Sequence, residues 1–166
     1  PKIVDFSNKT FYDNKLKKDN KNINLEIEPF MIYDIDGNEE IVGTSFINKK
    51  EAEKVIDIFN ELKKVIDDVI VISPYQAQCE LLKGLCNELK IHTVDSFQGK
   101  ESDAVIMTTV RSGNSVGFWN DYRRLNVGMT RSKHVLRIVG NLETWEKNEG
   151  PLKKLAKYAN DKGIIF

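Results

Sequence analysis

The chain has 166 residues and a mass of 19.0 kDa, with 25 basic and 25 acidic side chains. This length suits one domain with a sizeable core. Hydrophobic residues make up 40% and charged residues 30%, with only 10 Gly and 4 Pro, which excludes a collagen-like, mucin-like or wholly disordered chain. Apolar runs fall short of the roughly 20 residues that span a bilayer. The first residues lack a signal-peptide pattern, so we expect a cytoplasmic protein without a membrane partner.

Two further features concern the context of the chain. It begins with Pro1 rather than Met, so we expect it to be part of a longer protein. Cys79 and Cys86 lie seven positions apart in a helical pattern, about 10 Å along the axis, which is too far for a disulfide. This cysteine usage favours a reducing compartment.

The charges are balanced overall but unevenly distributed. Residues 1–70 hold 11 Lys/Arg against 15 Asp/Glu, whereas residues 71–166 hold 14 against 10. All five arginines lie between Arg111 and Arg137 in a chain that otherwise uses lysine. Because arginine offers a rigid fork for phosphate or carboxylate, this window is a candidate anion-binding region, although each arginine singly could also pair with a surface carboxylate.

The first 28 residues are polar and centre on the lysine-rich stretch 15–22. Such a run can contact nucleic acid, but a solvated loop is the more common outcome and the one we expect. Residues 29–35 then predict a strand, and Asp36-Gly37-Asn38 predicts a turn.

Two helices are predicted on either side of a buried strand. Asn48-Lys49-Lys50-Glu51 has the form of a capping box, and apolar residues recur at helical spacing over 52–66. Residues 69–72 are continuously apolar, which is typical of a strand covered on both faces in a parallel sheet. A second helical stripe runs over 77–89.

The remaining chain continues the alternation of strands and helices, which predicts an α/β fold with a mainly parallel sheet flanked by helices. We assign 1–166 to a single domain, with an opening polar segment at 1–28 and an α/β core at 29–166. The later elements are strands at 91–94, 103–110 and 135–139, a loop at 111–121, a helix at 121–131, and closing helices near Trp145 and over 151–162.

Ligands of such folds bind beyond the carboxyl ends of the strands. Three polar segments are expected there, at residues 73–76, 95–101 and 111–131. The sequence therefore predicts a ligand site built from these segments.

Several familiar catalytic motifs are absent. The chain has neither Gly-x-x-x-x-Gly-Lys-[Ser/Thr] nor Gly-x-Gly-x-x-Gly, so it cannot cradle a triphosphate in the P-loop manner by itself. Its His and Cys residues lack zinc spacing, and we expect no metal site. A small hydrolase of doubly wound fold would need His92 or His134 as its base, but core or surface roles are favoured for both.

Two motifs carry chemistry that suits a phosphorylated ligand. In Gln98-Gly99-Lys100-Glu101, the carboxylate follows a glycine turn and can accept hydrogen bonds from ribose hydroxyls, while the Gln98 amide can position water or a phosphate. In the helix over 121–131, Arg124 and Arg131 lie on one face. An arginine aimed at a phosphate on a neighbouring domain is an arginine finger, which supplies about 10³–10⁵ in rate.

These residues belong to a longer series of motifs in fixed order and spacing. The series resembles the second RecA-like domain of superfamily 1 helicases, in the 5′-to-3′ branch that includes the nonsense-mediated-decay helicase. The resemblance covers essentially the whole chain and implies a RecA-like P-loop NTPase fold without its own Walker A motif. The segments that carry it are 73–78, 93–103, 110–112, 117–118, 123–131 and 139–141.

The resemblance implies that ATP binds between this chain and an N-terminal RecA-like domain, which supplies Walker A, Walker B and the Mg²⁺ site. Arg131 matches the arginine that reaches the γ-phosphate, and Glu101 matches the acidic residue that contacts the nucleotide. Gln98 and Gly99 match the turn that couples nucleotide to nucleic acid. The implied catalytic residues are thus Arg131, Gln98 and Glu101, and the implied nucleotide contacts are Gly99, Glu101, Arg131 and Arg124, the last with a structural role as the alternative.

The resemblance also implies a path for single-stranded DNA or RNA. Two departures from the family pattern are Gly128-Met129 in place of Ala-Leu, and Ser132-Lys133 in place of Ala-Arg, which would weaken one basic contact. The residues expected along the path are Pro74, Tyr75, Thr93 and Ser96, with Arg111 and Ser112 beside it.

The implied function is the C-terminal motor domain of an ATP-dependent helicase that translocates on and unwinds nucleic acid. Such a domain would be inactive without the first RecA-like domain. The alternative is a non-catalytic nucleic-acid-binding or interaction module that retains the fold.

Overall fold

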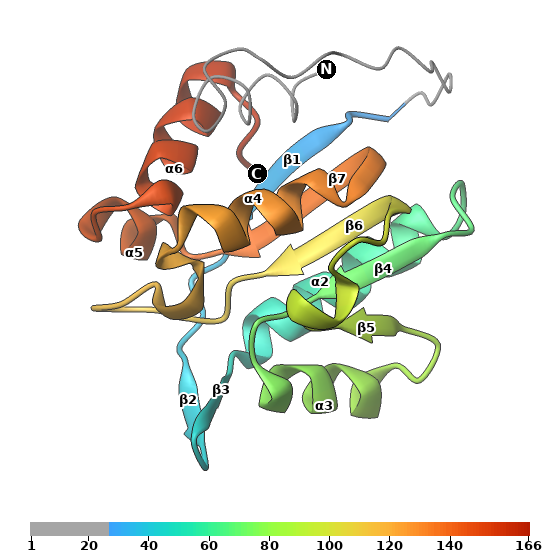
Figure 1. Cartoon of the computed structure of the whole chain (residues 1–166), viewed down its shortest axis with the longest axis horizontal. Coiled ribbons are helices and arrows are strands. Elements are labelled where there is room, and N and C mark those ends of the chain that lie inside the picture. The colour runs from blue at the N-terminus through green and yellow to red at the C-terminus, as the bar shows by residue number, and fades with distance from the viewer. Residues whose placement is uncertain (1–26) are drawn as a thin grey trace.

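The structure is a computed structural model that describes residues 27–166. A parallel sheet runs through it in the order β1-β7-β6-β4-β5 (Figure 1), which confirms the α/β fold expected from the sequence. The lysine-rich stretch at 15–22 lies outside the described residues. The strands are β1 (Phe30–Asp34), β4 (Val69–Ile72), β5 (Lys90–His92), β6 (Ser102–Thr108) and β7 (Ser132–Gly140).

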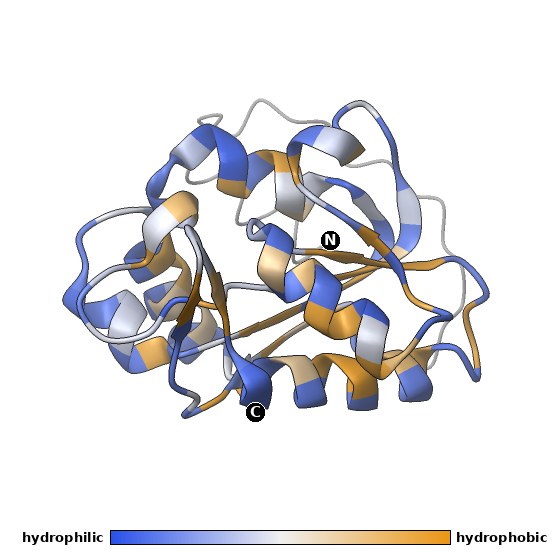
Figure 2. Ribbon diagram, turned by 90° about the horizontal axis from the view of Figure 1, so that it is seen from below, coloured by the Kyte–Doolittle hydropathy of each residue, from blue (hydrophilic) through white to orange (hydrophobic). Residues whose placement is uncertain are grey.

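Helices cover both faces of the sheet, and the central strands are therefore apolar on both sides. Every residue of β4 is buried, as the apolar run at 69–72 predicted. Figure 2 shows the apolar strands lying between helices that carry both polar and apolar residues. One face carries α2 (Lys49–Leu62) and α3 (Gln76–Leu85), and the other carries α4 (Tyr122–Thr130), α5 (Leu142–Lys147) and α6 (Pro151–Lys162).

The start of α2 follows the capping signal in the sequence, but only half of the predicted capping box forms, because the Asn48 N donates to Gln78 rather than to Glu51. Asn48 is its N-cap residue, and the side-chain oxygen accepts a hydrogen bond from the Glu51 backbone N at 3.1 Å. The helix ends at Leu62, before the predicted end, yet Ile66 in the following turn is still buried. Apolar spacing therefore identified the buried side chains better than it identified the helix end.

A small hairpin was not expected from the sequence. Strands β2 (Glu40–Val42) and β3 (Ser45–Ile47) pair antiparallel and project from the body of the molecule (Figure 1). Strands this short give too few residues for an alternating pattern to be recognised. Two 3₁₀ turns were also missed, η1 (Asp95–Phe97) and η2 (Gly117–Asn120).

The connections between parallel strands decide where the polar segments lie. Each connection leaves the carboxyl end of one strand and must return to the amino end of the next. Residues 95–101 therefore begin beyond β5 but end directly before β6, and residues 111–131 end directly before β7. The expectation that all three polar segments gather at the carboxyl ends is wrong for Glu101 and Arg131. We call the side where the strands begin the amino edge, and the side where they end the carboxyl edge.

Candidate functional site

Arg131 and Glu101 lie beside each other at the amino edge. They directly precede Ser132 of β7 and Ser102 of β6, which are partners in the parallel register. The backbone N of Ser102 donates to the carbonyl O of Arg131 at 3.0 Å, and Arg131 Nη1 donates to the carbonyl O of Lys100 at 3.4 Å. Strand pairing thus brings together two residues that the sequence analysis linked to a nucleotide.

The end of α4 positions the Arg131 side chain. Arg131 is the C-cap residue, and its Nε donates to the carbonyl O of Val127 at 3.2 Å. The helix dipole favours a cation at this end. Among the residues that the structure describes, no carboxylate forms an ion pair with this guanidinium. Neutral groups hold the charge in place without neutralising it, and this arrangement fits a phosphate ligand.

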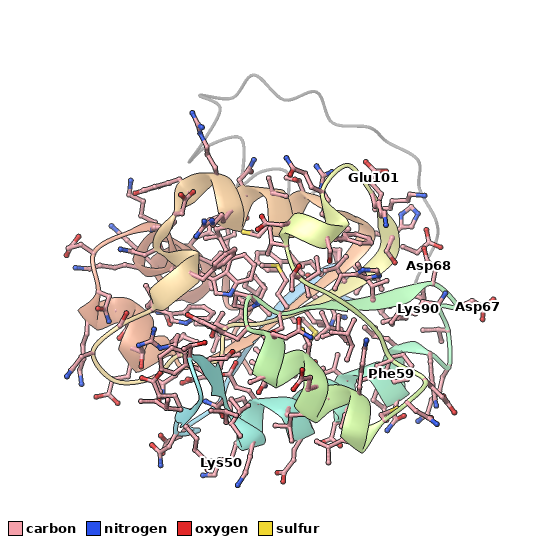
Figure 3. The ribbon with its side chains drawn as sticks, turned by 60° about the horizontal axis from the view of Figure 1, so that its bottom comes forward. Lys50, Phe59, Asp67, Asp68, Lys90 and Glu101 are labelled. Carbon is pink, nitrogen blue, oxygen red and sulfur yellow. The ribbon has the colours of Figure 1, made fainter. Side chains whose placement is uncertain are left out.

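The turn before β6 is open to solvent. Gly99 has a φ of +78°, a conformation that favours glycine, and it turns the chain from η1 toward β6. Gln98 and Glu101 are both exposed. In Figure 3, Glu101 lies on the same side of the molecule as Asp68 and Lys90, which also stand where strands begin.

Arg124 lies toward the other end of α4. About two helical turns, roughly 10 Å along the axis, separate it from Arg131. Its Cζ lies 4.1 Å from the centroid of the Phe118 ring. The two arginines share a helix, but the structure does not bring them together around one phosphate-sized site. A nucleotide contact by Arg124 stays a prediction.

Tyr75 and Arg111 meet at the carboxyl edge, where they follow β4 and β6. The Tyr75 hydroxyl accepts a hydrogen bond from the Phe118 backbone N at 3.2 Å, and its ring packs edge-on against Phe46 with centroids 5.3 Å apart. Arg111 Cζ lies 4.0 Å from the centroid of the same Phe46 ring. The hairpin that the sequence analysis missed therefore forms part of this cluster.

Arg111 is held more tightly than Arg131. Its Nε forms an ion pair with Glu39, and its side chain is 17% exposed. Burial alone would lower the pKa of Arg111, but hydrogen bonds to Tyr75 and Glu39 outweigh it and raise that pKa above its ordinary value. Ser112, the next residue, accepts a hydrogen bond from the Glu39 backbone N at 2.8 Å. Glu39 thus fixes both members of the predicted Arg111-Ser112 contact.

Gly117 completes this packing. Its φ is +58°, and a Cβ there would lie 2.2 Å from the Tyr75 hydroxyl and 2.8 Å from Arg111 Nη1. Glycine is required both by the backbone conformation and by the lack of space.

Pro74, Thr93 and Ser96 lie at the same edge, after β4 and β5. The backbone N of Ser73 donates to the carbonyl O of His92 at 3.1 Å, which ties the two strand ends together. Ser96, within η1, donates from Oγ to the carbonyl O of Thr93 at 3.0 Å. All six residues expected along the nucleic-acid path therefore share the carboxyl edge.

Glu51 belongs to the capping box predicted at the start of α2, and no further role was predicted for it from the sequence. It is fully buried, and its Oε1 accepts hydrogen bonds from Thr108 Oγ1, Thr109 N and Val110 N, each at 3.0 Å. Burial raises the pKa of Glu51 to about 7, although these hydrogen bonds act to lower it. The sequence did contain a signal for this burial, because Glu51 lies at helical spacing from the buried residues Val55, Ile58 and Leu62 of α2.

One departure from the family pattern has a local packing reason. A Cβ at Gly128 would lie 2.8 Å from Met107 Cε and 3.1 Å from the Trp119 ring. These two side chains fill the room that an alanine would need. Ser132, which stands in place of alanine, donates from Oγ to the carbonyl O of Met129 at 3.2 Å.

The structure gives little support to a hydrolase site that uses His92 or His134 as its base. The His92 ring packs 5.0 Å from the Phe97 ring, and burial lowers the pKa of His92. His134 Nε2 lies 3.8 Å from Asp103 Oδ1. Within residues 27–166, no group of three or more His, Cys, Asp or Glu could hold a metal ion. None of the helices described there is long and apolar enough to cross a bilayer.

Comparison with known proteins identifies the family. The family model described as AAA domain matches residues 1–143, which is most of the chain. The chain belongs to the AAA domain family. Its relatives include helicases and regulators of nonsense transcripts, and this confirms the resemblance to the second RecA-like domain of superfamily 1 helicases of the nonsense-mediated-decay type.

Three curated relatives illustrate the match. An uncharacterized ATP-dependent helicase of Methanocaldococcus jannaschii is 38% identical over 95% of this chain and 27% of the relative. Helicase sen1 of Schizosaccharomyces pombe is 32% identical over 90% of this chain and 10% of the relative. Regulator of nonsense transcripts 1 of Dictyostelium discoideum is 31% identical over 99% of this chain and 14% of the relative. The chain therefore spans about a quarter or less of the length of these proteins.

A solved structure agrees with the fold. The C-terminal domain of a possible DNA helicase from Lactobacillus plantarum matches with a TM-score of 0.58 and 15% identity, over 91% of this chain and 88% of that one. At this identity, the likeness concerns the fold alone.

Proposed function

We propose that this chain is the C-terminal motor domain of an ATP-dependent superfamily 1 helicase, with a nucleotide face at its amino edge and a nucleic-acid face at its carboxyl edge. The observation that carries the proposal is the separation of two residue sets by the sheet. Arg131 and Glu101 lie where β6 and β7 begin, whereas Tyr75 and Arg111 lie where β4 and β6 end.

At the amino edge, the chain completes a nucleotide site that another domain begins. ATP and Mg²⁺ would be held by the N-terminal RecA-like domain, and hydrolysis of the bound ATP supplies the energy for movement. Arg131 provides a guanidinium on a rigid helix end, without an ion-pair partner among residues 27–166, and this suits the γ-phosphate. Glu101 provides a carboxylate for ribose hydroxyls.

At the carboxyl edge, the chain provides half of a track for single-stranded DNA or RNA. Arg111 and Tyr75 supply a fixed cation and a hydroxyl, and Thr93, Ser96 and Ser112 supply short polar groups beside them. Side chains of these types contact the sugar and phosphate of nucleic acids. Contacts of this kind carry no direct information about the base sequence.

One connection can couple the two faces. Residues 93–101 run from Thr93 and Ser96 at the carboxyl edge to Glu101 at the amino edge. A shift of this connection when the two domains close on nucleotide would move its contacts with the strand. Opening after hydrolysis would reverse the shift.

The test uses a longer protein in which this chain follows its first RecA-like domain. Arg131→Ala should lower ATP turnover at saturating nucleic acid by about 10³-fold or more, with strand affinity retained. Arg111→Ala should weaken strand affinity and leave turnover at saturating strand close to wild type. If both variants affect both readouts equally, the two-face proposal is wrong.

The isolated chain gives a second test. It should hydrolyse no ATP, and it should bind single strands weakly and with strong salt dependence, because it holds half the track and carries no net charge. ATP turnover that Arg131→Ala abolishes in the isolated chain would contradict the proposal. Tight, salt-independent strand binding would favour a self-sufficient binding module instead.

A further inference from the structure

The carboxyl end of β6 leads into a strained turn. Val110 has a φ of +68°, and within residues 27–166 no other non-glycine residue has a positive φ. A β-branched side chain disfavours this conformation. The Arg111 backbone N donates to the carbonyl O of Thr109 at 2.7 Å, which closes the rarer, strained form of γ-turn around Val110. Arg111 leaves β6 directly through this turn.

Two side chains from the start of α2 hold the turn from behind. Glu51 Oε1 accepts a hydrogen bond from the Val110 N at 3.0 Å, and Asn48 Nδ2 donates to the Val110 carbonyl O at 3.0 Å. Both backbone polar groups of the strained residue are therefore bound by side chains of one helix end. A strained conformation persists only where its surroundings fix it in this way.

The same network reaches the other half of the carboxyl-edge cluster. Gln78 of α3 accepts a hydrogen bond from the Asn48 N at 2.9 Å and donates to the Asn48 carbonyl O at 3.1 Å. Tyr75, which contacts Arg111, is the N-cap residue of that helix. The α2 start thus fixes Arg111 through the turn and Tyr75 through α3.

We propose that Glu51 is a positioning residue for the nucleic-acid face: by holding the strained turn at Val110, it sets the direction in which Arg111 and Ser112 leave β6. The inference rests on the proposed function of that face. Glu51 is buried and cannot contact a nucleic-acid strand itself. Its Oε2 has no hydrogen-bond partner among the described residues. Burying a carboxylate oxygen without a hydrogen bond opposes folding. The favourable contribution of Glu51 to stability therefore comes from the hydrogen bonds by which Oε1 holds the turn at Val110.

The test compares variants of the full 166-residue chain in two measurements. One is the anisotropy of a labelled single-stranded oligothymidylate at low salt, and the other is amide hydrogen exchange at Val110 and Arg111. Glu51→Gln retains an acceptor oxygen and should keep strand affinity within about twofold of wild type. Glu51→Ala should weaken affinity by about tenfold and accelerate exchange at both amides relative to the interior of β6. The Val110 amide loses its acceptor directly, and the γ-turn that engages the Arg111 amide loses its support.

Matched controls separate positioning from general destabilisation. Glu53→Gln removes a carboxylate from the exposed side of the same helix and should change neither readout. Ile58→Val lowers stability through the buried side of α2 without touching the turn, and should leave strand affinity unchanged. Val110→Gly in the Glu51→Ala background should restore most of the affinity, because glycine adopts a positive φ without strain.

Two outcomes would overturn the proposal. The first is a folded Glu51→Ala chain with wild-type affinity and wild-type exchange at Val110 and Arg111. If that variant does not fold, Glu51→Asp shortens the side chain by one methylene, and wild-type behaviour in a folded Glu51→Asp chain would be the second.

Failure of the proposed function would look different. If Arg111→Ala leaves strand binding unchanged, the nucleic-acid face is wrong and the positioning role for strand binding falls with it. The exchange measurement would then show separately whether Glu51 holds the turn.

Discussion

The two edges of the sheet hold their arginines in opposite ways. At the carboxyl edge, Arg111 is ion-paired with Glu39 and stacked on Phe46, and its side chain is only 17% exposed. At the amino edge, Arg131 contacts backbone carbonyls and a hydroxyl, without a carboxylate partner among the described residues. At the carboxyl edge, the partners of the arginine come from this chain. At the amino edge, the charge of Arg131 is left for a ligand or another domain to pair with.

This difference matches what each edge would bind under the proposed function. A surface that is ordered during folding does not pay the ordering entropy again when a strand binds. A nucleotide between two domains, by contrast, must be reached and released in every cycle, so its arginine benefits from few competing ion pairs. The contrast between the tightly packed carboxyl edge and the more open amino edge can be tested by substitutions at both.

The largest expected effect compares two glycines with similar backbone conformations. Gly117 and Gly99 have φ values of +58° and +78°, but a Cβ would collide with Tyr75 at Gly117 and would meet nothing within 4 Å at Gly99. Gly117→Ala should lower the free energy of unfolding by about 3 kcal/mol, from backbone strain plus overpacking. Gly99→Ala should lower it by about 1 kcal/mol, from strain alone. Urea unfolding measures both, and equal losses would mean that the carboxyl edge is not the more tightly packed one.

The second prediction concerns Glu51, the buried carboxylate that holds the turn at the carboxyl edge. The pKa of Glu51 is about 7 in the folded chain, against an ordinary value of 4.5. The folded state holds this proton more tightly, so the group stabilises the fold fully below about pH 4.5 and loses that contribution as the pH rises through about 7. The loss should reach about 2–3 kcal/mol between pH 5 and pH 8. Urea unfolding at a series of pH values measures it.

The control for this prediction is Glu51→Gln, which lacks the titrating proton. The difference between the wild-type and Gln curves isolates Glu51 from other groups, including His92, whose burial-lowered pKa makes stability rise with pH instead. Parallel curves for the two chains would show that the pKa of Glu51 is not raised.

The sequence predicted much of the fold because its signals are local. The continuous apolar run at 69–72 identified a strand buried on both faces, and Asn48 identified the start of α2. The hairpin at 40–47 was missed because its strands are too short to show a period. Its Phe46 acquires a role only through contacts with Tyr75 and Arg111, which are distant in the sequence.

The residues proposed for the candidate site came from the sequence, and their roles stay predictions, whereas their arrangement in space was not predicted. The chemistry of the motifs and the family resemblance pointed to Glu101 and Arg131, yet only strand connectivity shows that they lie at the amino edge rather than beyond the strand ends. Glu51 was hidden for another reason. A carboxylate in a capping position normally faces solvent, and the three donors that make it a buried hub come from the end of β6 and the turn that follows.

The smallest expected effect compares the two arginines themselves in the isolated chain. Arg111→Ala removes an ion pair that is largely shielded from water and a cation–π contact with Phe46, and it leaves Glu39 without its partner. It should lower the free energy of unfolding by about 1–2 kcal/mol. Arg131→Ala removes hydrogen bonds to carbonyls that water can replace, and should lower it by less than about 1 kcal/mol. Thermal unfolding at low and high salt distinguishes the two, because screening weakens the interaction of the half-buried Arg131 cation with the dipole of α4 more than the shielded Arg111–Glu39 pair. If Arg131→Ala proved the more destabilising change, the amino-edge arginine would be a structural cap of α4 rather than a charge held ready for a ligand.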